Sequence, residues 1–419
     1  MTSFQTNAFT ANGRTYTPPA RPIAVICLDG SADEYLDAAL VRGRVPNLQK
    51  FAIDGYRGLA RGAMPSFTNV NNASIVTGVP PCIHGIGGNY FYEAATGQEV
   101  MMNSARFLRV DTIFPAAARS GRRVAVITAK DKLRDIFAHG LIEKGGIAFS
   151  SEKANQARRE THGIESVEKL VGLPTPPVYS ADASTFLFRA GVKLLEHNLA
   201  DFLYLSTTDF IQHKFRPEES EALDLYAAID EQLGRLVALG ALVGITADHG
   251  MNAKQKPDGS PNVIYLESEL TKKYGPGFRV ILPITDPYVV HHGALGSFAV
   301  VHLPPKITAR RKFNILHFLN NLPGVTEVYG RNAAEKLQLP ADRLGDIVVI
   351  SGRDVVLGRT PEYHDLKAIE GGLRSHGGRY EEMVPFVFSH PLKPEYAARA
   401  AADPRNFDIF DFTLNGLQS

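Results

Sequence analysis

Residues 201–250 read DFLYLSTTDFIQHKFRPEESEALDLYAAIDEQLGRLVALGALVGITADHG and hold two short apolar runs separated by a helix-like segment. The runs at 201–206 and 241–246 are apolar on both faces, as expected of strands in the middle of a sheet that helices cover. Between them, the apolar side chains that recur at helical spacing are Leu223, Tyr226, Ile229, Leu233 and Leu236. The pattern stops at Gly240, which predicts a crossover helix between two parallel strands.

The rest of the chain repeats this alternation of strand-like and helix-like segments. Runs at 23–28 (IAVICL), 123–128 (RVAVIT) and 384–389 (VPFVFS) predict further strands, so we expect an α/β fold with a mainly parallel central sheet flanked by helices. The first twenty or so residues are rich in Thr, Ala and Pro. We expect them to form an arm over the surface rather than part of the core.

The pattern changes near residue 252. Strand-like runs at 278–284, 296–303 and 346–352, with a helix-like run at 313–322, predict a smaller α+β unit inserted into the main fold. We therefore predict a core formed by residues 1–251 and 371–419, and an inserted cap domain at 252–370.

Composition limits the class of protein. The chain has 419 residues, 44% of them hydrophobic, and a net charge of +1, so it can bury a large core and lacks the basic bias of a nucleic-acid-binding protein. The two cysteines, Cys27 and Cys82, do not suggest a disulfide framework. The N-terminus is polar, and no apolar run approaches the roughly 20 residues of a membrane helix. We predict a cytoplasmic protein with no membrane or nucleic-acid partner.

Seven side chains able to bind a metal follow predicted strand ends or loops: Asp29, Thr68, Asp209, His213, Asp248, His249 and His376. In an open parallel sheet the carboxyl ends of the strands converge on one crevice, so residues distant in sequence meet there. Taken alone, Asp29 can be a turn aspartate, Thr68 an N-cap, Asp209 with His213 a surface pair, and His376 a loop histidine, whereas Asp248-His249 before Gly250 is a stronger signal. Together they predict a two-metal site for phosphoryl transfer.

Thr68 is the candidate nucleophile of this set. The segment PSFTNVNNASIVTG (65–78) reads as a loop that enters a helix, and the N-terminus of a helix favours phosphoryl oxygens. A free threonine hydroxyl is a poor nucleophile. Coordination to a divalent metal would lower its pKa enough for attack.

The order and types of these seven residues resemble the alkaline phosphatase superfamily, and within it the chain is similar to the phosphonoacetate hydrolases, from 23 to 389. The resemblance implies an α/β core with an inserted cap and two metal ions, usually zinc (Zn²⁺). It further implies that Asp209, His213 and His376 hold one zinc ion, and that Asp29, Thr68, Asp248 and His249 hold the other. No ligand of the pattern is missing.

The same resemblance implies substrate contacts by Asn89, in GGNYF, and by Lys130 and Lys132, in ITAKDKLR. Asn89 would donate to a phosphonyl oxygen and a lysine would bind a carboxylate. The alternative for both lysines is a solvated turn. His291 and His292 fall within the insertion without an evident carboxylate partner, and we leave them unassigned.

The resemblance also implies the reaction, hydrolysis of the carbon–phosphorus bond of a small anionic phosphonate, phosphonoacetate, with Thr68 as the nucleophile. Direct attack by hydroxide, with Thr68 only a ligand, stays open. A nucleotide phosphodiesterase or a phosphomonoesterase would keep the metal ligands and differ in its pocket, and a metal-stabilised binding protein is a third alternative. A homodimer is left open as the oligomeric state.

Overall fold

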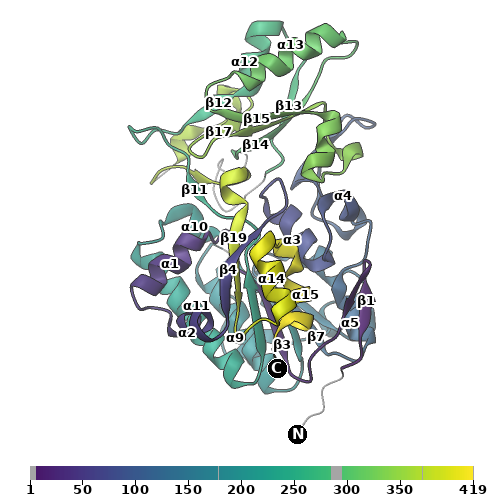
Figure 1. Ribbon diagram of the computed structural model, residues 1–419, viewed down its shortest axis with the longest axis vertical. Helices are drawn as coiled ribbons and strands as arrows, with labels where there is room; N and C mark the ends of the chain where they lie inside the picture. The colour runs from purple at the N-terminus through teal and green to yellow at the C-terminus, as the bar shows by residue number, and fades with distance from the viewer. Residues whose placement is uncertain (1–5, 178, 285–294, 370, 419) are drawn as a thin grey trace.

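The computed structural model describes residues 6–177, 179–284, 295–369 and 371–418, and its centre is a seven-stranded sheet (Figure 1). The strands lie in the order β4-β19-β10-β3-β9-β7-β8. Their bounds are β3 Ile23–Cys27, β4 Tyr56–Arg61, β7 Val124–Thr128, β8 Ile147–Ser150, β9 Phe202–Ser206, β10 Leu242–Thr246 and β19 Met383–Phe388. The five strands from β10 to β8 are parallel, and β19 is antiparallel to both of its neighbours.

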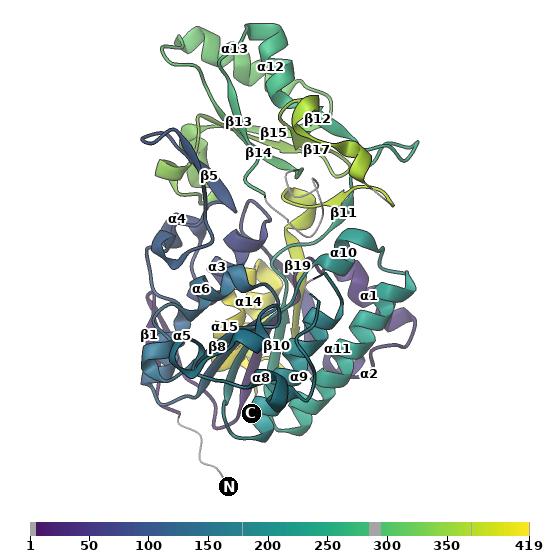
Figure 2. The ribbon, with the colours of Figure 1, turned by 180° about the vertical axis from the view of Figure 1, so that it is seen from behind.

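Helices cover both faces of this sheet (Figure 1, Figure 2). Alternate residues of β3 point to opposite faces: Ile26 packs with one group of helices and Val25 with the other. The helices packed on the Ile26 face are α1 Asp33–Val41, α2 Pro46–Asp54, α8 Val167–Val171, α9 Asp182–Glu196 and α11 Ser220–Ala238. The helices packed on the Val25 face are α3 Thr68–Thr77, α5 Ile113–Arg119, α6 Asp131–Ala138, α14 Pro394–Ala402 and α15 Ile409–Asp411.

The predicted α/β class and the predicted strands are confirmed. Strands β3, β7, β9 and β10 occupy the four runs that are apolar on both faces, and all five residues of each are buried. Helix α11 links β9 to β10 as the helical spacing indicates. The run at 384–389 also forms a strand, β19, but it pairs antiparallel with β10, so the sheet is mixed.

A second, antiparallel sheet lies at the other end of the molecule (Figure 1). Its four strands lie in the order β13-β14-β16-β15, with bounds β13 Arg279–Ile281, β14 Phe298–His302, β15 Val325–Gly330 and β16 Ile347–Ser351. Helices α12 (Leu266–Tyr274) and α13 (Ala309–Asn320) pack against it. The expected α+β elements are therefore present.

Short strand pairs connect the two sheets. The chain leaves the main fold through β11 (Asn252–Ala253) and returns through β18 (Arg374–Ser375), which pair antiparallel. Beyond them, β12 (Val263–Tyr265) pairs with β17 (Val356–Gly358). A hairpin of β5 (Tyr90–Glu93) and β6 (Gln98–Met101) comes from the N-terminal half of the chain and lies beside the smaller sheet (Figure 2). The exact division into domains at 252 and 370 stays a prediction.

The expectation of an N-terminal surface arm is wrong for the described residues. Strands β1 (Phe9–Ala11) and β2 (Arg14–Tyr16) form a hairpin, and the rings of Phe9 and Tyr16 are buried and stack at 5.2 Å between centroids. The turn is Asn12-Gly13, both with positive φ. This dipeptide is the preferred turn of a two-residue hairpin.

The remaining α-helices of the described residues, α4 (Pro81–His84), α7 (Arg159–His162) and α10 (Phe210–Lys214), are short, and several short 3-10 helices lie in the loops. Across the described residues, none of the helices combines the length and the apolar character needed to cross a membrane.

Candidate metal centre

Three aspartates emerge at the carboxyl ends of neighbouring parallel strands. Asp29 follows β3, Asp209 follows β9 and Asp248 follows β10, and all three carboxylates are buried. Because β10, β3 and β9 are adjacent and parallel, their ends open on the same edge of the sheet. The loop after β3 turns at Gly30, with φ of 71°, and a Cβ there would lie 2.7 Å from Cβ of Asp209. Glycine at position 30 therefore allows the two loops to approach.

The first triad consists of Asp29, Asp248 and His249. One candidate ligand atom from each lies within 4.8 Å of the others. Nε2 of His249 is 3.3 Å from Asp29 and 3.8 Å from Asp248. Oγ1 of Thr68 is 3.2 Å from the same Nε2, so the predicted nucleophile adjoins this triad.

The second triad consists of Asp209, His213 and His376, again with candidate ligand atoms within 4.8 Å of one another. His213 lies one turn after Asp209 on α10, and its Nε2 is 3.1 Å from the carboxylate. His376 follows β18, far along the chain. Its ring stacks on that of His249 with 3.5 Å between centroids, so the two triads are in contact.

All three histidines are oriented in the same way. Nδ1 of each ring donates to a backbone carbonyl: His213 to Arg374 at 3.0 Å, His249 to Gly250 at 2.9 Å and His376 to Ser66 at 2.8 Å. A hydrogen bond at Nδ1 fixes the tautomer and leaves the lone pair of Nε2 for a metal. This arrangement is typical of histidines that bind a metal.

Two buried atoms identify where a cation fits. Nε2 of His376 is fully enclosed and has no hydrogen-bond partner among the described residues. Oδ1 of Asp29 is also fully enclosed, and its contact with Nε2 of His249 at 3.3 Å lacks hydrogen-bond geometry. Buried polar atoms normally have partners, and a divalent cation would supply one to each. A donor set of carboxylates and imidazoles suits zinc without being exclusive to it. The residues present therefore fit two divalent metal ions.

The electrostatics of the first triad support this fit. Burial and the adjacent Asp29 carboxylate raise the pKa of Asp248 well above its usual range. Burial opposes charge on His249, yet the carboxylates of Asp248 and Asp29 raise its pKa to about 9. The first triad thus concentrates negative charge in a water-poor place, where a cation is favoured.

Lys130 links the two triads. Its Nζ donates to Asp29 at 2.8 Å and to Asp209 at 2.6 Å, and the side chain is buried. Burial alone would raise the pKa of Asp209, but Lys130 and His213 hold it well below the usual value. The solvated-turn alternative is wrong for Lys130. Lys132 lies two residues further, half-buried in the first turn of α6.

Thr68 is the first residue of α3 and is buried. Phe67 occupies the N-cap position and no side chain caps this helix, so the N-cap alternative for Thr68 is wrong. Asn89 is also buried beside this helix end, where its Oδ1 accepts from the backbone N–H of Asn69 at 3.2 Å. His291 and His292 lie outside the described residues.

The sequence prediction missed residues that support the ligands. Asn72 donates to Asp248 at 2.9 Å and accepts from the Tyr204 hydroxyl at 2.9 Å. It lies one helical turn after Thr68 and donates to the carbonyl of Thr68 at 3.1 Å. The sequence did contain a signal for this role, because Asn72 follows Thr68 by four residues, one helical turn. Asparagines that are buried in a helix, such as Asn71 and Asn72, need specific hydrogen-bond partners.

A buried ion pair braces the loops that carry two of the histidines. Nζ of Lys254 donates to Glu381 at 2.8 Å, and both side chains are fully buried. The other oxygen of Glu381 accepts from the backbone N–H of Gly378 at 2.9 Å, two residues after His376. The backbone carbonyl of Glu381 accepts from Gly250, which follows His249, at 2.8 Å.

The chain matches known proteins over nearly its whole length. Residues 23–378 match the family model of type I phosphodiesterases / nucleotide pyrophosphatases. Two solved structures of phosphonoacetate hydrolase from Sinorhizobium meliloti 1021 each share 99% coverage of both chains. The complex with phosphonoacetate has 47% identity and a TM-score of 0.91, and the complex with phosphonoformate has 48% and 0.92.

A more distant structure shares the fold. Inactive murine ectonucleotide pyrophosphatase / phosphodiesterase 5 in complex with AMP has a TM-score of 0.59 at 15% identity, with 95% of this chain and 96% of that chain covered. At this identity the likeness concerns the fold alone.

Proposed function

The chain belongs to the type I phosphodiesterase / nucleotide pyrophosphatase family, and on that premise we propose that it hydrolyses the carbon–phosphorus bond of phosphonoacetate to acetate and phosphate. The observation that carries the proposal is the meeting of both triads with Thr68 and Lys130 in one buried site. The similarity to phosphonoacetate hydrolase over 99% of both chains supports the choice of substrate.

We assign the metal ligands as the family resemblance implies. Asp209, His213 and His376 would hold one cation, and Asp29, Thr68, Asp248 and His249 the other, with zinc as the proposed metal. When bound, the two cations supply Lewis-acid charge that polarises the phosphonate and favours the deprotonated Thr68 oxygen.

Thr68 performs the first chemical step. Its hydroxyl gives up its proton to water, and the oxygen attacks phosphorus: a phosphorus–oxygen bond forms and the phosphorus–carbon bond breaks, with the electron pair leaving on the acetate carbon. That pair is delocalised into the carboxylate as an enolate, and protonation from water gives acetate. A second water then hydrolyses the phosphothreonine, which returns Thr68 and releases phosphate.

The surroundings of Thr68 favour this step. The oxygen lies at the N-terminus of the ten-residue helix α3, whose partial positive charge stabilises an anion there. Asn89 lies at the same helix end, and we assign it to hold a phosphonyl oxygen. The net charge of the chain is only +1, so a doubly anionic substrate depends on local cations.

Lys130 and Lys132 supply that local charge at the start of α6. Lys130 already neutralises Asp29 and Asp209, so its charge is shared with the metal ligands. We assign binding of the substrate carboxylate to this pair of lysines, which would also stabilise the enolate. A cytoplasmic location and a homodimer stay predictions.

A substrate panel tests the proposal. The zinc-loaded protein is incubated with phosphonoacetate, phosphonoacetaldehyde, phosphonopyruvate and p-nitrophenyl phosphate, and phosphate release is followed. We expect phosphonoacetate to be turned over with the highest kcat/KM, with one acetate formed per phosphate. Preference for the ester would replace the proposal with a phosphomonoesterase or phosphodiesterase. No turnover of any substrate by metal-loaded protein would favour a binding protein.

A further inference from the structure

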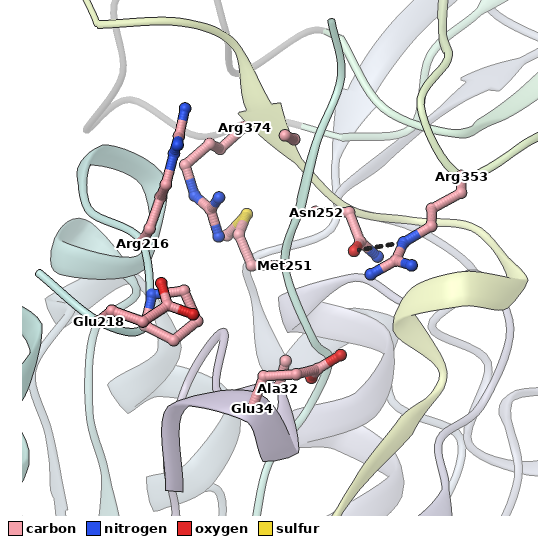
Figure 3. Close-up of a pocket in the computed structure, with 10 residues that line it drawn as sticks. Ala32, Glu34, Arg216, Glu218, Met251, Asn252, Arg353 and Arg374 are labelled. Atoms are coloured by element: carbon pink, nitrogen blue, oxygen red, sulfur yellow. Dashed lines mark hydrogen bonds between the residues drawn. The ribbon is translucent and has the colours of Figure 1, made fainter. Parts of the chain in front are cut away.

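A second pocket lies on the chain segments that flank the metal ligands, and it is lined by other residues. Its volume is about 390 Å³, and its lining includes Arg216, Arg353 and Arg374 (Figure 3). Among the described residues, the lining contains neither triad, Thr68, Asn89 nor either of the lysines at the start of α6. The pocket is therefore distinct from the proposed substrate site.

The three arginines line two sides of this pocket. Arg216 and Arg374 lie side by side on one wall, and Arg353 lies opposite, where it donates to Asn252 at 3.1 Å (Figure 3). Within the part of the chain that the structure describes, none of the three guanidinium groups lies within 4.0 Å of a carboxylate. Glu34 and Glu218 also line the pocket, but they leave an excess of positive charge there.

The positive charge of Arg374 is energetically unfavourable where it lies, because the residue is buried. Arg374 is only 9% exposed, and its guanidinium donates to two neutral acceptors, the carbonyl of Gln212 at 2.8 Å and the hydroxyl of Tyr35 at 3.0 Å. A buried cation held by neutral groups lacks the compensation that a counter-charge gives. An anion in the pocket would supply that compensation, and arginine forks match the oxygens of phosphate and carboxylate.

Arg374 is also bonded to the second triad. The backbone carbonyl of Arg374 accepts from Nδ1 of His213 at 3.0 Å. The guanidinium of Arg374 donates to the carbonyl of Gln212, the residue before His213. His376 lies two residues after Arg374. An anion that binds Arg374 and shifts its side chain would therefore also shift the segments that carry His213 and His376, two of the three ligands of this triad.

We propose that this pocket is a second oxyanion site, which binds a small phosphate or carboxylate anion and modulates the second triad through Arg374. The proposal goes beyond the proposed function and stands without it, since it depends only on the pocket and its contacts. Both products of the proposed reaction belong to this chemical class, so product binding is one source of the ligand.

Phosphate binding to the full chain tests the proposal. Equilibrium dialysis with labelled inorganic phosphate is carried out on the zinc-loaded protein and on protein stripped of metal, in buffer free of other oxyanions. We expect two bound phosphates per zinc-loaded chain, and one after stripping, because the metal centre loses its phosphate and the pocket keeps it. Acetate added as a competitor shows whether a carboxylate displaces the pocket phosphate or whether the pocket is selective for phosphate; either result fits the proposed class.

The double variant Arg216→Ala/Arg353→Ala removes the two exposed arginines and keeps Arg374, and because both sites are exposed we expect the fold to be unchanged. We expect it to bind the pocket phosphate at least tenfold more weakly in the stripped protein. The variant Arg189→Ala removes an exposed arginine that lines another pocket, and it should bind phosphate as the wild type does. Unchanged phosphate binding in the double variant, or no binding to stripped wild-type protein at millimolar phosphate, would overturn the proposal. A chain that fails to hydrolyse phosphonoacetate but still shows this binding would refute only the proposed function.

Discussion

The two triads of the metal centre differ in charge and in how the fold supports them. The first triad has two carboxylates and one imidazole, and it is built on the ends of β3 and β10 in the middle of the main sheet. The second has one carboxylate and two imidazoles, and it needs His376, which arrives only after the chain has returned through β18. The first triad is thus a product of the main sheet, whereas the second also depends on the closure of the inserted region.

The charges follow the same division. Asp248 of the first triad has a pKa raised well above the usual range by burial and by Asp29. Lys130 and His213 hold the pKa of Asp209 of the second triad well below it. Lys130 contacts Asp29 as well as Asp209, so it partly neutralises both triads. The first triad still has the greater need for a cation, because it contains one carboxylate more than the second. Variants that act on one triad alone should separate these two requirements.

Removal of the metals should have the largest effect. Exhaustive chelation should abolish phosphate release, because neither triad can supply the positive charge that the phosphonate and the Thr68 oxygen require. Restoring zinc should restore turnover. Metal content, measured as the chelator is increased, should fall in two steps, since the triads differ in carboxylate number. Full activity in metal-free protein would contradict the assignment of both triads.

Thr68→Ala should act mainly through the first triad. It removes the attacking oxygen and the hydroxyl beside His249, so kcat should fall by about a thousandfold or more. Thr68→Ser keeps the oxygen and should retain measurable turnover. Near-normal hydrolysis by Thr68→Ala would show that hydroxide attacks directly and that Thr68 is only a ligand.

Lys254→Met should destabilise the protein and disturb the second triad more than the first. It leaves the fully buried Glu381 without its ion partner, which costs about 3–5 kcal/mol of unfolding free energy. Glu381 accepts a hydrogen bond from the backbone N–H of Gly378, two residues after His376. Loss of this contact should displace His376 and lower the zinc affinity of the second triad.

Arg122→Met is the matched control for this variant. Arg122 forms another buried ion pair, with Asp201, away from both triads. Denaturant unfolding and zinc competition should show lost stability in both variants and lost zinc affinity only in Lys254→Met. Equal zinc affinity in both variants would show that the Lys254–Glu381 pair contributes to stability and does not position the second triad.

Replacing Lys132 at the start of α6 should have the smallest effect on activity. Comparing it with Lys130 should separate a role in substrate binding from a role in supporting the triads. Lys132→Ala should lower kcat/KM for phosphonoacetate roughly ten- to a hundredfold and leave a phosphate ester nearly unaffected, because a charge-assisted hydrogen bond to the carboxylate is lost. Lys130→Ala should harm both substrates, since Lys130 contacts Asp29 and Asp209. Equal losses for Lys132→Ala on both substrates would remove carboxylate recognition from Lys132.

Local pattern was enough to predict the strands that carry the site. Strands β3, β9 and β10 are apolar on both faces, and the polar residues that follow them had to emerge at one edge. The antiparallel pairing of β19 was not predictable from its own residues, because a buried strand reads alike in either direction. The Asn12-Gly13 turn was a usable hairpin signal that the composition of the N-terminus obscured.

The support of the site depends on contacts that no local pattern contains. Lys130 and Asp29 are 101 residues apart in the sequence, and Lys254 and Glu381 are 127 residues apart. A lysine in a charged turn is usually solvated, so its sequence alone gave no reason to place Lys130 between two carboxylates. The ligand types could be predicted from strand ends, whereas the groups that orient and neutralise them required the structure.

Metal content of matched histidine variants tests most directly whether the two triads are two halves of one catalytic centre. His249→Ala removes one ligand of the first triad and His376→Ala one ligand of the second. We predict about two zinc ions per wild-type chain, about one in each variant, and no turnover of phosphonoacetate by either variant. Two ions retained in either variant, or wild-type turnover with one ion, would contradict the two-triad centre.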